Sequence, residues 1–338
     1  MRIATWNVEW FSALFADDGR VLDDAEPSWR EGVNRADQLA AIAIVLTAMD
    51  ADAVMVIEAP DTSPHRSGVR ALESFARYFD LRTRRAVIGF ANDTKQEIIL
   101  LQDPDKLMAE HDPRGDPVQR AGAFPRFDSR FKVDLGNGAG SERVTWSKPP
   151  LELAVTTAQG TRLRMIGVHA KSKAPSGARS EAEIRRRARA ARRKHVAQCL
   201  WLRGRADEHL AAGDPLILLG DLNDGPGLDA HERDLGRSGL EIVLDGDGGA
   251  PLHDPHARAA IARPDRAPTT ARFFLPEEDR CLTALLDYVM VSPDLAARQG
   301  RWRIWHPLDD PGCRDTPELR EALLTASDHF PVTLDIDI

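Results

Sequence analysis

The sequence contains only three cysteines among 338 residues, and Cys199, Cys281 and Cys313 lie far apart. Their spacing matches none of the closely spaced pairs that bind structural zinc. An odd and sparse set of cysteines is typical of reduced thiols in a cytosolic protein. A disulfide framework and a thiolate metal site are therefore excluded, and we expect a cytoplasmic protein.

Long hydrophobic runs are missing as well. No stretch approaches the 18 or so consecutive apolar residues that a membrane-spanning helix needs. A predicted strand begins at Arg2, which leaves no space for the charged and apolar regions of a signal peptide. We therefore expect neither a membrane span nor a secretion signal.

An excess of basic charge is also absent, since 45 Lys and Arg stand against 53 Asp and Glu and the net charge is -8. The molecule as a whole is not a polycation, which weakens the case for a nuclease that follows a nucleic-acid backbone. The densest basic run, residues 185–194, falls in a predicted helix. Its arginines spread around the helix, which favours a solvated outer surface over a phosphate-binding face.

What the sequence does contain is enough apolar material for a sizeable core. Hydrophobic residues make up 42% of the chain and charged residues 29%, as in folded globular proteins. A chain of this length fits one large α/β domain or two ordinary ones.

The most informative stretch is a run of four aliphatic residues, Leu216 to Leu219, which predicts a strand buried on both faces. Gly220 ends this strand, and Asp221 and Asn223 follow. Residues two apart on an extended segment point the same way, so one ligand could contact both side chains. The same residue types also form turns, and this alternative stays open here.

Polar side chains follow other predicted strands in the same way. They are Asn7 and Glu9 after residues 2–6, Glu58 after residues 53–57 and His169 after residues 163–168. Helices are expected within each half, at residues 35–49 and from the Ser180-x-x-Glu183 capping box to about Leu210. Strand, helix and strand with polar ends therefore occur twice, and two facing halves would bring the four ends to one edge.

Further strands are expected at residues 87–90 and 97–101, and loops at residues 102–128 and 263–280. The second loop contains Phe273 and Phe274, which could form a stacking platform or pack against the core.

Two more polar positions belong to this set. Asp287 lies within the apolar strand 286–291, and a buried carboxylate needs a partner. Asp328 and His329 precede a last strand and could form a catalytic pair or a surface turn. Glu58 could likewise be an ordinary acid at a strand end.

Together these motifs, in this order, resemble the endonuclease/exonuclease/phosphatase superfamily. The superfamily includes deoxyribonuclease I, exonuclease III-type repair nucleases, sphingomyelinases and inositol polyphosphate 5-phosphatases. The resemblance spans residues 2–334 and implies one domain over residues 1–338. It implies an α/β fold, a four-layer α/β sandwich in which two mixed β-sheets pack face to face with helices outside.

The resemblance also implies a role for each motif. The metal ligands would be Glu58, helped by Asn7, Glu9 and Asp328. The catalytic groups would be Asp221, His169, Asn223 and the pair Asp287 and His329. In these roles Asp221 orients or deprotonates the attacking water, whereas Asn223 and His169 contact the phosphate. His329, aligned by Asp287, binds the phosphate or transfers a proton.

One departure from the superfamily pattern is that Ile57 stands where Gln usually precedes the metal-binding Glu. Another is His169, where some repair nucleases have Tyr. A His followed by Lys171 and Ser172 is more similar to the deoxyribonuclease I, sphingomyelinase and small phosphodiesterase members.

The chemistry of such a site follows from its charges. A phosphodiester is an anion that repels hydroxide, and a hard cation held by carboxylate and amide oxygens neutralises it. Oxygen ligands without Cys favour Mg²⁺ or Mn²⁺. Lys148, Lys171 and Lys173 are candidates for steadying the phosphoryl oxygens.

We therefore predict a metal-dependent phosphoesterase that hydrolyses phosphodiesters. Its substrate would be a small diester or a nucleic acid, and the acidic net charge favours the small diester. The alternatives are a nuclease, a phosphomonoesterase, or a catalytically inert binding protein of the same fold. No protein partner can be inferred.

Overall fold

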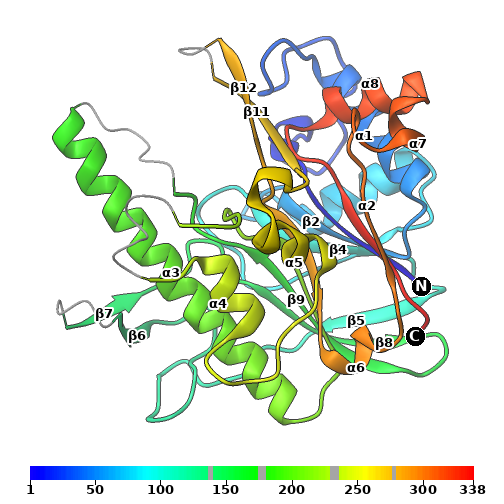
Figure 1. Ribbon diagram of the computed structural model, residues 1–338. Coiled ribbons are helices and arrows are strands. Elements are labelled where there is room, and N and C mark those ends of the chain that lie inside the picture. The colour runs from blue at the N-terminus through cyan, green and yellow to red at the C-terminus, as the bar shows by residue number, and fades with distance from the viewer. Residues whose placement is uncertain (136–139, 174–179, 229–235, 276–278) are drawn as a thin grey trace.

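Two β-sheets pack face to face in the computed structural model, which describes residues 1–135, 140–173, 180–228, 236–275 and 279–338 (Figure 1). The six-stranded sheet has the order β14 (Arg301–Ile304), β15 (Val332–Asp335), β1 (Arg2–Asn7), β2 (Ala53–Ala59), β4 (Glu97–Gln102) and β3 (Arg85–Ile88). The five-stranded sheet has the order β13 (Asp287–Val291), β10 (Leu216–Asp221), β9 (Arg162–His169), β8 (Leu151–Thr157) and β5 (Leu107–His111). Two hairpins stand apart: β6 (Phe131–Asp134) with β7 (Ser141–Val144), and β11 (Ala271–Leu275) with β12 (Arg280–Ala284).

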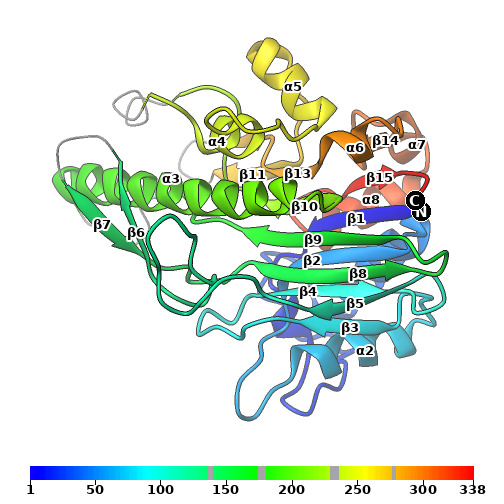
Figure 2. The ribbon, with the colours of Figure 1, turned by 90° about the horizontal axis from the view of Figure 1, so that it is seen from below.

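Helices cover the outer faces of both sheets (Figures 1 and 2). Outside the six-stranded sheet lie α1 (Arg35–Met49), α2 (Gly68–Tyr78), α7 (Pro311–Arg314) and α8 (Pro317–Ala326). On the other side lie α3 (Glu181–Ala211), α4 (Gly239–Asp245) and α5 (Pro255–Ala262), with the short α6 (Pro293–Ala296) below them in Figure 1. The expected four-layer α/β sandwich is confirmed. No helix in the described part of the chain has the length and apolar character needed to cross a membrane.

The alternation of side chains along β2 shows how the layers are held together. Met55 and Ile57 pack into the core between the two sheets, whereas Val54 and Val56 pack under α1, α2 and α8. Successive side chains of a strand point to opposite faces, so a strand covered on both sides must be apolar throughout. This explains why the continuous apolar runs in the sequence predicted central strands correctly.

The twofold repeat predicted from the sequence is also present. β1 and β2 are parallel and joined by α1, and β9 and β10 are parallel with α3 between them. β1 and β2 face β9 and β10 across the central core. The carboxyl ends of parallel strands lie at one edge of a sheet, so this topology gathers the polar residues that follow all four strands.

The two expected loops both contain strands. β5 lies within residues 102–128, where the buried Leu107 and Ala109 alternate with the exposed Met108 and Glu110. β11 lies within residues 263–280 and pairs with β12. Both strands are short and pair with a neighbouring strand on one side. This pairing stabilises them although the surrounding sequence is rich in Pro, Asp and Arg, which favour loops.

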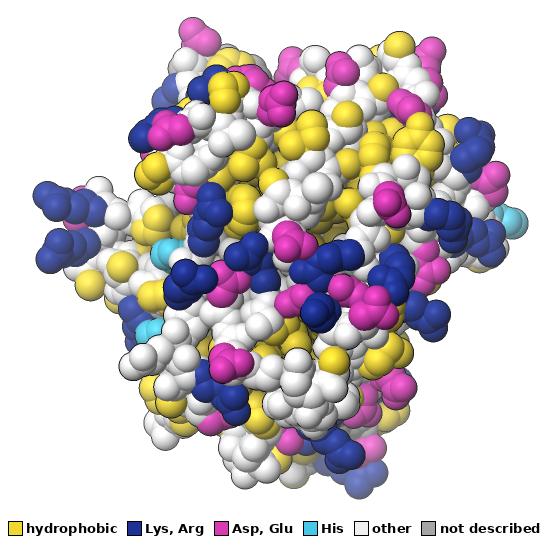
Figure 3. All heavy atoms as spheres, turned by 90° about the vertical axis from the view of Figure 1, so that its right-hand side faces the viewer, with side chains coloured by type: hydrophobic (Ala, Val, Ile, Leu, Met, Phe, Trp, Pro, Cys, Tyr) yellow, Lys and Arg dark blue, Asp and Glu magenta, His cyan; other side chains and the backbone are white. Residues whose placement is uncertain are grey.

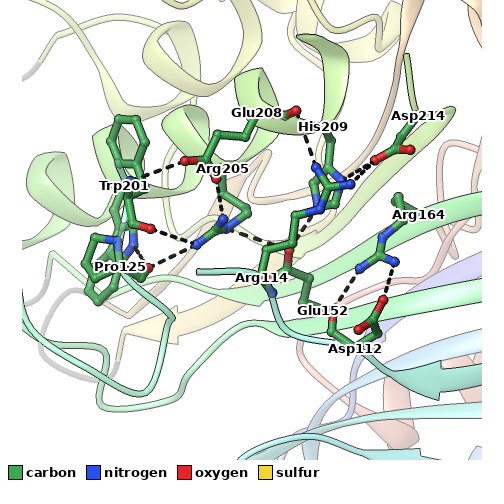
Figure 4. A network of polar contacts seen from close by, with 11 residues as sticks. Asp112, Arg114, Pro125, Glu152, Arg164, Trp201, Arg205, Glu208, His209 and Asp214 are labelled. Atoms are coloured by element: carbon green, nitrogen blue, oxygen red, sulfur yellow. Dashed lines mark hydrogen bonds and ion pairs between the residues drawn. The ribbon is translucent and has the colours of Figure 1, made fainter. Parts of the chain in front are cut away.

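A buried polar network joins β8 to the C-terminal half of α3 (Figure 4). The Glu152 carboxylate is fully buried, accepts from the Nε2 of His209 at 2.8 Å and lies 3.7 Å from Arg205. The other ring nitrogen of His209 contacts Asp214 at 2.8 Å, and Asp214 also pairs with Arg114 at 2.6 Å. Charges without water must be balanced by such partners.

Glu152→Gln should therefore destabilise the fold, because it leaves the buried Arg205 and His209 facing a neutral amide. We expect the free energy of unfolding to fall by about 3 kcal/mol. Urea denaturation monitored by circular dichroism measures this change. Glu110→Gln, on the exposed face of β5, is the matched control and should change stability by less than about 0.5 kcal/mol. An equal effect of both variants would show that the network does not stabilise the fold.

Candidate active site

The end of β10 is shaped by Gly220, whose φ is 136°. A Cβ at this position would lie 2.1 Å from the carbonyl oxygen of Val168 on β9, so no side chain fits. The close approach of the two strands places Asp221 opposite His169 in the ladder. The Oδ2 of Asp221 lies 3.6 Å from the Nε2 of His169.

Asp221 is almost fully buried and accepts three hydrogen bonds from two asparagines. The backbone N–H of Asn223 donates to its Oδ1 at 2.7 Å, and the side chains of Asn223 and Asn7 donate to its Oδ2 at 3.1 Å each. Burial and, after it, repulsion from the neighbouring Asp287 carboxylate together raise the pKa of Asp221 to about 7. A carboxyl group with a pKa near neutrality is suited to proton transfer.

Asp287 and His329 form a buried pair beside Asp221. The Nδ1 of His329 donates to the Oδ2 of Asp287 at 2.7 Å, and the Thr270 hydroxyl donates to the same oxygen at 2.8 Å. Burial alone would lower the pKa of His329, but attraction to Asp287 and then Asp221 outweighs it and raises the pKa to about 10. The ring is therefore an imidazolium at neutral pH. The Phe273 ring approaches it edge-on, with centroids 5.5 Å apart.

Glu58 reaches the site through a β-bulge at the end of β2. Its φ is 59°, and the pairing of β2 with β4 shifts register between Ile57 and Ala59. In a regular strand Ile57 and Ala59 would point to the same face of the sheet, but Ile57 packs between the sheets and Ala59 packs under the helices. Glu58 is therefore the extra residue of the bulge and belongs to neither face. Its carboxylate lies 3.9 Å from His169, and burial raises its pKa.

A second pair of acids, Glu9 and Asp328, lies at the outer edge of the site. Glu9 pairs with Arg30, and burial raises the pKa of Asp328 to about 6. Ser327 connects this rim to the centre, because its hydroxyl donates to the carbonyl of Asn7 at 2.8 Å and accepts from the backbone N–H of Glu9 at 3.2 Å. The segment before β15 is thereby fastened to the end of β1.

Of the three candidate lysines, Lys148 lies deepest in the site. Its Nζ is 3.1 Å from the Nδ1 of His169. Burial lowers the pKa of Lys148, and burial together with the Lys148 charge lowers that of His169 well below its usual range, so the imidazole is neutral. Lys171 is close enough to influence both groups. Lys173 instead pairs with the buried Asp224, so its ammonium does not lie against His169 as that of Lys148 does.

Sequence reasoning missed two residues of the site, Thr270 and Arg30, and gave no role to Ser327, which stands in one motif with Asp328 and His329. Thr270 contacts Asp287, Ser327 contacts Asn7 and Arg30 contacts Glu9, so each acts through a residue in another part of the chain. Residues of these types are common on surfaces, and the local sequence around Thr270 and Arg30 does not mark them. Only the motif partners were recognisable.

The residues at the end of β1 and β2 fit a hard divalent cation. The Nδ2 of Asn7 donates to Asp221, but its buried Oδ1 has no hydrogen-bond partner among the described residues. A buried amide oxygen without a donor is costly, and a cation beside it would satisfy it. The adjacent carboxylate of Glu58 supplies negative charge, and both groups are oxygen donors of the kind that Mg²⁺ and Mn²⁺ prefer.

Comparison with solved structures gives the same fold at low sequence identity. The 3′ phosphatase NExo from Neisseria, bound to a product DNA hairpin, is 16% identical with a TM-score of 0.52, and 100% of each chain is covered. TDP2 from D. rerio, complexed with a single-strand DNA product, is 12% identical with a TM-score of 0.50, over 100% of this chain and 99% of that one. No curated protein matches the sequence.

The family model described as "Endonuclease/Exonuclease/phosphatase family" matches residues 4–329, which include every motif described above. Enzymes of this family depend on divalent metal ions and hydrolyse phosphoesters. The chain therefore belongs to the Endonuclease/Exonuclease/phosphatase family and is a metal-dependent phosphoesterase.

Proposed function

We propose that this site hydrolyses phosphodiesters, with Asp221 as the general base and His329 as the fixed positive charge. The observation that carries the proposal is the pair of groups with perturbed pKa values in one buried cluster. Asp221 has its pKa raised to about 7 and His329 to about 10. Neighbouring groups whose pKa values are moved in this way mark an acid and base assignment.

Each group then has a separate task. Asp221 accepts a proton from the attacking water, and its position is held by Asn7 and Asn223. His329 is charged because of Asp287 and stabilises the negative charge that develops on the phosphoryl or leaving oxygen. His169 is neutral and donates a hydrogen bond to a phosphoryl oxygen.

Lys148 adds a positive charge next to His169, and Lys171 lies beside it at the rim. The charge of Lys173 is balanced by Asp224, so we assign this lysine to holding the loop in place. The phosphate therefore meets two lysines and one imidazolium.

Asn7 and Glu58 would hold a Mg²⁺ or Mn²⁺ ion, with Glu9 and Asp328 at its outer side. Such an ion neutralises the phosphate and polarises its oxygen when bound. Asp221, Asp287 and His329 also place their ligand atoms within 4.8 Å of one another. The 2.7 Å bond between Asp287 and His329 occupies these two groups, so we assign this second cluster to catalysis and not to metal binding, with Asp221 as the base and His329 as the fixed charge.

A diester is preferred over a monoester because of charge. A monoester dianion carries twice the negative charge into a cluster of carboxylates that includes Asp221, Asp287 and Asp328. With Mg²⁺ present, we expect kcat/KM for bis(p-nitrophenyl) phosphate to exceed that for p-nitrophenyl phosphate by about tenfold or more. Faster hydrolysis of the monoester would assign the site to a phosphomonoesterase, and no hydrolysis of either would overturn the proposed small-diester activity.

A further inference from the structure

The loop at residues 117–122 and the β6–β7 hairpin line a hollow of about 870 Å³, which we call the basic hollow. The lining residues that matter here are Arg120, Arg130, Lys132, Arg143, Thr145 and Trp146. We propose that the basic hollow binds the phosphate backbone of a nucleic-acid strand whose scissile phosphate lies at the catalytic centre. This inference rests on the proposed function and names its substrate class.

The basic hollow is a built feature of the fold. Trp146 is buried at its floor and packs against Phe127 and Trp201, with ring centroids 6.0 and 6.3 Å apart. Gln119 connects the loop at residues 117–122 to β6, because its side chain makes two hydrogen bonds to the backbone of Lys132, at 2.7 and 3.3 Å. The walls are therefore held in place without a ligand.

The cations of the basic hollow are largely unbalanced. Arg120 pairs with Asp116 at 2.8 Å, whereas no described carboxylate pairs with Arg130, Lys132 or Arg143. Asp128, the one acid among the described lining residues, already accepts from two guanidinium nitrogens of Arg126, at 2.7 Å each. On a chain with a net charge of -8, this local excess of positive charge creates a potential that attracts anions.

One pair of these cations points to a ligand directly. Lys132 and Arg143 lie opposite each other in the β6–β7 ladder. Like charges at directly opposed positions of a hairpin destabilise it, unless an anion lies against them. On the face that carries both termini, by contrast, basic and acidic side chains alternate (Figure 3). There Arg82 pairs with Asp50, Asp52 and Asp103.

The basic hollow is linked to the catalytic centre through the short segment from Trp146 to Lys148. Only Ser147 separates Trp146 from Lys148, so the two Cα atoms are at most about 7 Å apart. The Nζ of Lys148 contacts His169. Ser147, between Trp146 and Lys148, accepts a hydrogen bond from the Nζ of Lys194 at 3.0 Å. Lys148, Lys194 and the hollow therefore form a path of positive charge leading away from the site.

A polymer explains this path better than a small diester does. A small diester has one phosphate and no second anion to place in the basic hollow, whereas a nucleic-acid strand carries a phosphate at every residue. On the opposite side, the Phe273 ring beside His329 and the exposed Phe274 offer surfaces on which a base can stack. This reverses the preference for a small diester drawn from the net charge.

Lys132→Glu tests the proposal. It replaces a like-charge pair in the hairpin by an opposite-charge pair, so the thermal stability should stay equal or rise. We expect kcat/KM for a single-stranded oligonucleotide to fall about tenfold at low salt, and the slope of its logarithm against log salt to shrink by about one. Hydrolysis of bis(p-nitrophenyl) phosphate should stay unchanged. Arg143→Glu should behave in the same way.

Arg162→Glu is the matched control, because Arg162 is exposed at the start of β9, at the opposite end of that strand from His169. Fluorescence anisotropy with a labelled oligonucleotide measures binding independently of catalysis. Equal oligonucleotide binding by Lys132→Glu, Arg162→Glu and the unmodified protein would overturn the basic hollow as a binding site. If the unmodified protein did not hydrolyse the small diester at all, the proposed function would be overturned instead.

Discussion

Excess EDTA should reduce hydrolysis of bis(p-nitrophenyl) phosphate to the background rate, and added Mg²⁺ or Mn²⁺ should restore it. The buried Asn7 oxygen has no partner among the described residues, and burial raises the pKa of Glu58 beside it. These groups lie in a cluster with Asp221 and Asp287, and such carboxylates repel one another unless a cation lies between them. Full turnover in excess chelator would exclude this mechanism.

Glu58→Gln sharpens the same prediction, because it removes one negative charge from the proposed ligand set. We expect the Mg²⁺ concentration for half-maximal activity to rise about 10- to 100-fold. Glu97→Gln is the matched control: Glu97 is buried and pairs with Ala59, but its oxygens accept from Asn92 and Thr62. Calorimetric titration of Mg²⁺ into both variants should show weaker binding only for Glu58→Gln.

Asp221→Asn should lower kcat for the diester by about 10²- to 10⁴-fold, the usual contribution of a general base. KM should change little, since the proton moves only in the transition state. The melting temperature is measured alongside, because the variant leaves the side chains of Asn7 and Asn223 with one acceptor oxygen fewer.

Asp254→Asn separates catalysis from folding. Asp254 is also a buried aspartate whose pKa is raised by burial, but it caps α5 and accepts from Ala257 and Val289 at 3.0 Å each. This variant should lower the melting temperature and leave kcat unchanged. If Asp221→Asn kept a kcat within about fivefold of the unmodified protein, Asp221 would not be the general base.

Much of the fold was predictable because the central strands are buried on both faces. The runs 53–57 and 216–219 are continuously apolar, and this pattern has few alternatives in a chain of this size. The motif residues were predictable for a related reason. Asp287 stands in apolar company and needs a partner, and the structure supplies one, His329, 42 residues later in the chain.

The remainder depends on contacts between distant segments. β5 and β11 form because neighbouring strands pair with them, and their own residues resemble loops. Lys173 follows His169 closely in sequence, but the carboxylate of Asp224, 51 residues away, determines where its ammonium lies. The basic hollow draws its cations from separate parts of residues 117–145, so net charge and local runs gave no indication of it.

The bulge at Glu58 implies a conflict between stability and activity. A non-glycine residue with a φ of 59° costs about 1 kcal/mol or more, and glycine would relieve that cost. Burial of the carboxylate adds a further cost in the absence of a cation. Selection for a high melting temperature alone would replace this glutamate, so a variant with glycine here should be more stable and bind the metal ion less well.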